Sequence, residues 1–498
     1  MTNDGSRGLR TVSPLPRAWR FVSAAEIIEA ADEAPGATTM ERMRFGRAMQ
    51  AVLLLASVGS ATAMGAPALH VEPGPTVLDG EPVHVHVTGV QPGAQVALTA
   101  DRWFAGLSTR RPQAQLMRSQ AVFVADPQGR VDLRTAAPVS GSYEGADARG
   151  LFWSMVPVQG VDRAAQDAVD TTQVVLRLRA DDTVAEARVR LQPSRPAVRV
   201  VPADGLPGAV FASLPGDGKR PALILIGGSE GGTLITQSAA PFASHGLAVL
   251  ALPVFSPPDR SGAREVPELP AAWVELPIET LNRARDWLAA RPEVDSSRIA
   301  VHGTSTGSLL ALLGAVHLPW ISAVVANVPS DVVWDGWGPG VPPEQRSMFS
   351  LGGKPLPFVP AIGYDEETRG YEHGVPVIVR RVFERGRAAN PERAVAARVP
   401  VERIAAPVMV IGAYDDQLWP SGHMAQAIAE RRLEAGLSTE ALLYPGAGHL
   451  LYDTGYAPTT GYNLGLRKTG GTPLANAAAQ GEVWPRTIQF LKRALAAN

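Results

Sequence analysis

The stretch Arg298-Ile-Ala-Val-His-Gly-Thr-Ser-Thr-Gly307 decides the fold that we predict for this chain. It begins as an apolar run, typical of a buried strand, and a helical pattern from Ser308 to Leu313 follows it. A strand, a sharp turn of small residues and a helix make a nucleophile elbow, in which a strained backbone lifts a serine hydroxyl clear of the sheet. We therefore predict that Ser305 is a nucleophile. The alternative for this Gly-x-Ser-x-Gly motif is a plain strand-to-helix turn.

A serine hydroxyl needs a base that takes its proton and a carboxylate that orients the base. In the α/β-hydrolase order the acid and then the histidine follow the serine. One apolar strand ends just before Asp415 and Asp416, and a later short strand ends in Gly446-Ala-Gly-His449. Of the nine histidines, only His449 combines this order with a loop after a strand and a flanking glycine. We predict His449 as the base and Asp416 as the acid, because Asp416 stands four residues before Pro420, with Asp415 as the alternative.

An acyl-transfer intermediate also needs backbone N–H groups that stabilise its oxyanion. We predict that the amide of Thr306, the residue after the nucleophile, is one donor. The second comes from the glycine-rich loop 227–232, from the amide of Ser229 or Glu230. The alternatives for this loop are a flexible turn or a phosphate loop. It carries neither a Walker-A lysine nor a G-x-G-x-x-G spacing, so we predict no nucleotide and no cofactor.

Composition bounds the other function classes. A chain of 498 residues is too long for one ordinary domain, and 45% hydrophobic with 19% charged residues is globular. A net charge of -2 gives no support for nucleic-acid binding and does not indicate an electrostatic partner or an oligomeric state. The absence of cysteine excludes disulfides and thiolate metal sites. His84-Val-His86 could form a metal pair, but an exposed alternating strand is favoured, so we predict no metal.

The amino-terminal region, residues 1–66, reads as an extension with a signal peptide at about 40–63. A basic start at Met43-Arg-Phe-Gly-Arg47 leads to a short apolar core and an A-x-A end, with cleavage expected after Ala63. This core is too short to span a bilayer as a mature helix, so we predict no integral membrane span. A signal should begin the chain, so translation is expected to start at Met40 or Met43. The chain is then exported, for example to a periplasm; if the segment is instead an internal apolar helix, it is cytoplasmic.

Two domains are predicted after this extension. Short alternating strands with turns between them over residues 67–195 predict an antiparallel β-sandwich. After a linker near 194–215, strands alternate with helices over 205–498, which predicts a doubly wound, mostly parallel α/β sheet. Residues 331–403 form an insertion rich in Gly, Pro and aromatics. We interpret it as a lid or acyl-contacting wall, and ordinary packing of its aromatics is the alternative.

Over about residues 67–495 the chain resembles the acyl-CoA thioesterase and bile acid-CoA:amino acid N-acyltransferase family. The resemblance is carried by Leu69-His-Val-Glu-Pro73, Gly89-Val-Gln-Pro-Gly93, Asp126-Pro-Gln-Gly-Arg-Val-Asp-Leu133, Gly141-Ser-Tyr-Glu-Gly145 and Gly150-Leu-Phe-Trp-Ser-Met155. It implies a catalytic Ser305, Asp416 and His449 and a small-molecule substrate that is an acyl thioester or ester, with acyl-CoA expected. It also implies either hydrolysis or transfer to glycine or taurine. Because transferases of the family tend to use a cysteine nucleophile, Ser305 favours water as the acceptor.

Three other functions stay open. A carboxylesterase or a peptidase could use the same triad, and an exported enzyme would rarely meet CoA, which favours another ester or thioester as its substrate. A catalytically silent protein, whose sandwich binds a partner, is the alternative from another class.

Overall fold

The computed structural model describes residues 66–105, 113–259, 261–451, 454–461, 463–464 and 467–496. The predicted signal segment, 40–63, lies outside the described residues. Residues 64–498 belong to one compact unit. Among the helices that the structure describes, none has the length and apolar content needed to cross a membrane.

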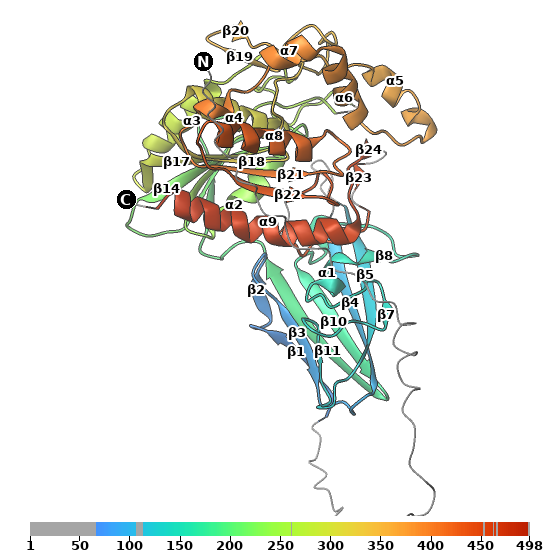
Figure 1. Cartoon of the computed structure of the whole chain (residues 1–498). Coiled ribbons are helices and arrows are strands. Elements are labelled where there is room, and N and C mark those ends of the chain that lie inside the picture. Colours follow the sequence, from blue (N-terminus) through green and yellow to red (C-terminus); the bar gives the residue numbers. More distant parts are fainter. Residues whose placement is uncertain are drawn as a thin grey trace, which may run out of the picture. The chain divides into compact units, whose positions relative to one another are not determined.

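The first described part is a β-sandwich (Figure 1). One sheet has the order β1-β3-β6, and the other has the order β2-β11-β10-β4-β5-β7, with β8 and β9 also paired to β5. Side chains such as Val85 and Val87 of β3 and Leu176 and Leu178 of β10 are fully buried in one shared core, because alternate residues of a strand point to the same face. The strands are β1 (Ala68–Glu72), β2 (Thr76–Leu78), β3 (His84–Thr88), β4 (Gln95–Ala105), β5 (Gln113–Val124), β6 (Val131–Asp132), β7 (Ser140–Gly141), β8 (Val156–Pro157), β9 (Ala164–Ala165), β10 (Gln173–Ala180) and β11 (Thr183–Gln192).

The second part is an eight-stranded sheet with the order β12-β13-β15-β14-β17-β18-β21-β22. The strands from β15 to β22 are parallel, and β12 and β13 add an antiparallel edge. This is the predicted α/β-hydrolase architecture, and the fold prediction is confirmed. The strands are β12 (Arg199–Pro202), β13 (Val210–Ser213), β14 (Arg220–Ile226), β15 (Ala248–Ala251), β17 (Val294–Thr304), β18 (Ile321–Asn327), β21 (Val408–Ala413) and β22 (Glu440–Tyr444).

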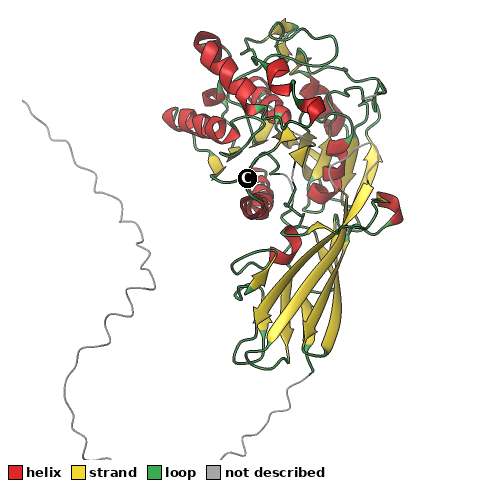
Figure 2. Cartoon of the chain, turned by 90° about the vertical axis from the view of Figure 1, so that its right-hand side faces the viewer, coloured by secondary structure: helices red, strands yellow, loops and turns green. Residues whose placement is uncertain are grey.

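Helices cover both faces of this sheet because its central strands are apolar on both sides. In β14, Ile224 packs in one core and its neighbour Leu223 in another. Figure 1 shows α3, α4 and α8 over one face and α2 and α9 over the other, and Figure 2 shows the helices gathered around this sheet rather than along the sandwich strands. The helices are α2 (Ala239–Ala243), α3 (Thr280–Ala289), α4 (Thr306–His317), α8 (Ser421–Glu434) and α9 (Pro473–Ala494).

One predicted boundary is wrong. The linker expected at 194–215 contains β12 and β13, so the catalytic sheet begins before residue 205. Every residue of β12 is exposed, and its four residues are too few to show a strand pattern before the turn that follows. The final helix begins at Pro473, and the side chain of Thr472 caps it by accepting a hydrogen bond from the Ala475 amide.

The insertion at 331–403 packs as part of the fold. Trp334 and Phe349 are fully buried in the core beneath it, and Trp337 and Phe358 pack against the same core. These four aromatic side chains therefore take part in ordinary packing, whereas Tyr364 is exposed. Its short elements are β19 (Phe349–Leu351), which pairs with β16 (Leu276–Pro277), β20 (Lys354–Pro355), α5 (Tyr364–Thr368), α6 (Arg380–Ala389) and α7 (Pro391–Ala396).

Candidate active site

Ser305 lies in a strained turn between the last residue of β17 and the first residue of α4. Its backbone angles are φ 55° and ψ -123°, a region that side chains other than glycine rarely adopt. The turn can be this tight because its neighbours are glycines. A Cβ at Gly303 would overlap the Gly307 carbonyl, and one at Gly307 would overlap the Gly227 carbonyl. The predicted strand, sharp turn and helix are therefore present at Ser305.

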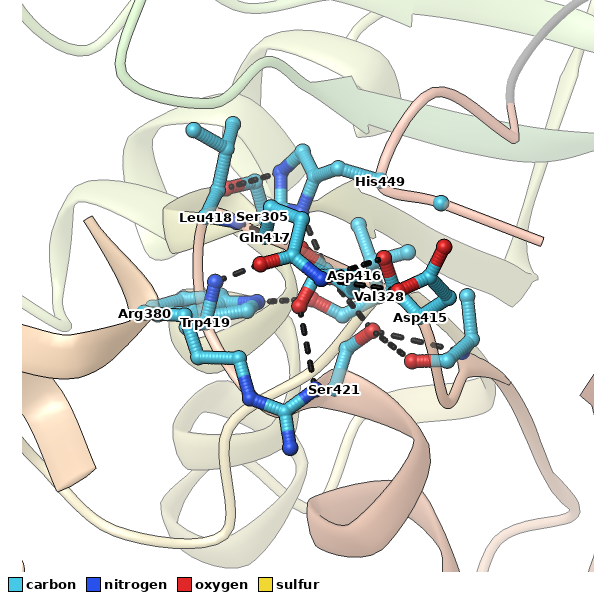
Figure 3. A network of polar contacts seen from close by, with 12 residues as sticks. Ser305, Val328, Arg380, Asp415, Asp416, Gln417, Leu418, Trp419, Ser421 and His449 are labelled. Atoms are coloured by element: carbon cyan, nitrogen blue, oxygen red, sulfur yellow. Dashed lines mark hydrogen bonds and ion pairs between the residues drawn. The ribbon is translucent and has the colours of Figure 1, made fainter. Parts of the chain in front are cut away.

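Three side chains from distant parts of the chain form one hydrogen-bonded series, drawn in Figure 3. His449 Nε2 lies 3.0 Å from Ser305 Oγ, and His449 Nδ1 lies 2.7 Å from Asp416 Oδ2. An ionised carboxylate only accepts hydrogen bonds, so the His449 proton belongs on Nδ1, and Nε2 is left to accept from the serine hydroxyl. Asp416 is 0% exposed and His449 is 4% exposed, so water does not compete for the contact between them.

The carboxylate of Asp416 is held on both oxygens. Its Oδ1 accepts hydrogen bonds from the backbone amides of Leu418 at 2.9 Å and Trp419 at 3.2 Å. Its Oδ2 accepts from Ser421 Oγ at 2.6 Å as well as from His449. The turn between β21 and α8 supplies the two amides and the first residue of α8 supplies the hydroxyl, and together they fix the plane of the carboxylate against the imidazole.

Asp415 faces a different part of the loop. Its Oδ1 accepts from Gln417 Nε2 at 2.8 Å, and its Oδ2 accepts from the Gly471 amide at 2.9 Å. Asp416 thus contacts His449, whereas Asp415 connects its own loop to the loop that contains Gly471.

The glycine-rich loop after β14 directs amides toward one acceptor near Ser305. The Gly228 amide donates to Glu230 Oε1 at 2.8 Å, and the Glu230 carboxyl group also receives a hydrogen bond from its own amide. Part of Glu230 is exposed, but burial of its carboxyl group raises its pKa, while the two amides act in the opposite direction. Sequence reasoning named the amides of Ser229 and Glu230 and missed this side chain, since only the folded loop turns it back over Gly228.

Thr306 is the first residue of α4. The first amides of a helix have no acceptor within that helix, so the Thr306 N–H is available to a ligand beside Ser305. The oxyanion roles of Thr306, Ser229 and Glu230 stay predictions.

A cavity of about 460 Å³ opens beside Ser305 and His449. It lies against α2 and α9, and Ser229, His302 and Asn327 are among its polar lining residues. Burial lowers the pKa of His302 to about 4, so this imidazole is neutral at pH 7. The described lining contains no residue of the insertion 331–403, and the role of that insertion as a lid or acyl-contacting wall stays a prediction. Its apolar lining residues are Leu225, Leu234, Ile235, Pro241, Phe242, Leu418, Leu450, Leu451, Val483 and Trp484.

Residues that follow His449 form hydrogen bonds with the sandwich. The Tyr456 hydroxyl accepts from the Val83 amide at 2.8 Å, and the Tyr456 carbonyl accepts from Arg102 at 3.1 Å. Thr454 donates to Asp79 at 2.6 Å. The sandwich therefore supports the loop that carries the histidine and also supplies Asp79 to the cavity wall.

Comparison with known proteins agrees with this architecture. Residues 276–497 match the family model described as BAAT / Acyl-CoA thioester hydrolase C terminal. Residues 80–202 match the model of the Acyl-CoA thioester hydrolase/BAAT N-terminal region.

Similar proteins are found among mammalian enzymes and among solved structures. The chain is 28% identical to acyl-coenzyme A amino acid N-acyltransferase 2 of Rattus norvegicus, over 84% of this chain and 96% of that protein. It is 27% identical to acyl-coenzyme A thioesterase 6 of Mus musculus, over 86% and 96% respectively. A solved esterase from Pyrobaculum calidifontis is 16% identical, with a TM-score of 0.35, and the match covers 60% of this chain and 86% of that one.

Proposed function

Because the chain belongs to the family of acyl-CoA thioester hydrolases and bile acid-CoA:amino acid N-acyltransferases, we propose that it is a serine hydrolase that cleaves acyl thioesters. The observation that carries this proposal is the hydrogen-bonded series from Ser305 through His449 to Asp416 at the wall of a largely apolar cavity.

In the first half of the reaction Ser305 Oγ attacks the thioester carbonyl and passes its proton to His449 Nε2. The C–S bond then breaks, and His449 returns the proton to the departing sulfur, which leaves as a free thiol. Asp416 holds Nδ1–H throughout and stabilises the imidazolium ion. The amide of Thr306 and the amide of Ser229 or Glu230 act on the oxyanion. For this to happen, the Glu230 carboxyl group must turn away from the loop amides from which it accepts hydrogen bonds.

In the second half a water molecule attacks the acyl-serine ester. His449 accepts a proton from the water and then gives it to Ser305 Oγ, so the acid is released and the serine is restored. An amine such as glycine or taurine could replace the water and give an amide. We propose water as the acceptor because the nucleophile is serine.

The apolar wall from Leu234 to Trp484 suits the acyl chain of the substrate. The leaving group is proposed to be CoA. If residues 40–63 export the chain, a non-CoA ester or thioester takes its place, and an enzyme isolated from its own cells would begin near Met64.

The test is release of free thiol from a series of acyl-CoAs, beside p-nitrophenyl esters of the same chain lengths. The protein begins at Met64, and Ser305→Ala is the inactive control. We expect thioester cleavage by the wild type, covalent labelling of Ser305 by a fluorophosphonate, and an acid product even when glycine or taurine is present.

Each alternative has its own result. Ester cleavage with little thioester cleavage would show that the leaving group is an alcohol and not CoA. An amide product would show that the acceptor is the amine and not water. A Ser305→Ala protein that keeps most of its activity would overturn the mechanism, and an unlabelled Ser305 in an inactive chain would indicate a binding protein.

A further inference from the structure

A cluster of histidine and carboxylate side chains lies on the sandwich, outside the candidate active site. Strands β1 and β3 pair antiparallel, and their register sets His70 opposite His86 and Glu72 opposite His84. These four residues alternate with Val71 and Val85, so they share the face of the sheet that points away from the core. Two adjacent cross-strand pairs therefore bring three imidazoles and a carboxylate to one place.

The distances within this cluster suit a metal ion. One ligand atom each from Glu72, His84 and His86 all lie within 4.8 Å of one another. His84 Nδ1 and Glu72 Oε2 lie 3.4 Å apart. Ligands about 2.0–2.1 Å from a tetrahedral zinc ion stand roughly 3.3 Å from each other, so this pair already has the required spacing.

The surroundings of the two histidines point the same way. His84 Nε2 lies 3.0 Å from Asp132 Oδ1 on β6, which leaves Nδ1 as the ring nitrogen for a metal. A carboxylate on the far nitrogen of a ligating histidine is the usual outer partner in zinc sites. His86 Nδ1 is enclosed and has no hydrogen-bond partner among the described residues. Its ring is stacked between those of His70 and His84, with centroids 4.7 and 4.8 Å away.

We propose that Glu72, His84 and His86 form a binding site for a divalent transition-metal ion, of the zinc type, that ties β1 to β3. Asp132 orients His84, and His70 covers one side of His86. Nitrogen-rich ligands select such ions over Mg²⁺ and Ca²⁺, which prefer oxygen. Three protein ligands leave the fourth position to water. The site shares no residue with the lining of the cavity beside Ser305, so the ion acts on the sandwich and not on the acyl-transfer chemistry.

The test uses the full chain without a histidine tag, dialysed against EDTA and then titrated with ZnCl₂ in a calorimeter. We expect one equivalent of zinc to bind with a dissociation constant in the micromolar range or below, and no saturable binding of MgCl₂. Zinc should also raise the unfolding temperature. His84→Gln and His86→Gln should each lower the affinity by at least tenfold, and Asp132→Asn should lower it about 10- to 100-fold.

The matched control is His423→Gln, which removes an exposed histidine on α8 and should leave zinc binding unchanged. Circular dichroism and acyl hydrolysis check that each variant is folded. The absence of saturable zinc binding to the wild type would overturn the proposal. So would wild-type affinity in a folded His86→Gln protein.

Discussion

Replacing Asp416 by asparagine tests the geometry of the candidate site most directly. Oδ1 of Asp416 accepts two backbone N–H groups, so the oxygen of an asparagine must stay at that position. The new NH₂ group then takes the place of Oδ2 and faces His449 Nδ1, which lies 2.7 Å away in the wild type. Two donors cannot face each other, so the imidazole proton moves to Nε2, and His449 can no longer accept the proton of Ser305.

The expected loss is large because the base is held in the wrong tautomer. A comparable change in a serine protease lowers kcat about 10⁴-fold, which corresponds to about 5.5 kcal/mol of activation free energy. Stability should fall far less, since the Ser421 hydroxyl can accept a hydrogen bond from the new NH₂ group.

The matched control is Asp415→Asn, which changes a carboxylate in the same turn that does not touch His449. We expect it to keep at least a tenth of the wild-type kcat. The assay is thiol release from one acyl-CoA under saturating conditions, with unfolding midpoints measured in parallel. Equal losses in the two variants, or a larger loss at Asp415, would refute the assignment of Asp416 as the acid.

Three further predictions follow from the cavity and its charges. Burial raises the pKa of Glu230, and once this carboxyl group ionises its negative charge repels the oxyanion. Glu230→Gln removes that charge, so it should raise kcat/KM by about tenfold over the wild type at alkaline pH and hardly at all at acidic pH. A ratio of variant to wild-type kcat/KM that does not change with pH would contradict this. Leu234→Trp narrows the apolar part of the cavity, so it should raise KM for long-chain substrates and leave KM for short-chain substrates unchanged. The measurement is KM over a series of acyl chain lengths. Since the pKa of His302 is about 4 when folded and near 6.5 when unfolded, the unfolded chain binds the proton first as the pH falls. The free energy of unfolding should therefore decrease by roughly 3 kcal/mol from this residue between pH 6.5 and 4, and urea unfolding of His302→Phe should lack this part of the decrease.

The sequence predicted the parts of the fold whose signals are local. The turn at Ser305 is marked by its own glycines and by an apolar strand before it, and β10 and β18 are continuous apolar or alternating runs. The aspartate and histidine loops were found because each follows such a strand in the order that the fold requires.

Features that depend on distant partners could not be predicted in this way. Nothing local distinguishes Glu230 as a side chain turned back over Gly228, or β12 as an exposed strand at the edge of the catalytic sheet. The aromatics of the insertion looked like substrate contacts because composition cannot tell a core from a cavity wall. His84 and His86 were visible as a pair, but His70 and Glu72 join them only through the pairing register of β1 with β3.

The hydrogen bonds of Tyr456 to Val83 and Arg102 also affect how substitutions in the sandwich should be interpreted. A substitution in the sandwich lies far along the chain from Ser305, so its effect on the reaction is not evident from the residues of the candidate active site alone. Because Tyr456 stands only seven residues after His449 in the chain, we expect that loss of the Arg102 contact disturbs the position of the base and lowers the reaction rate. A catalytic domain produced without the β-sandwich would therefore lack the contacts that support the chain near His449.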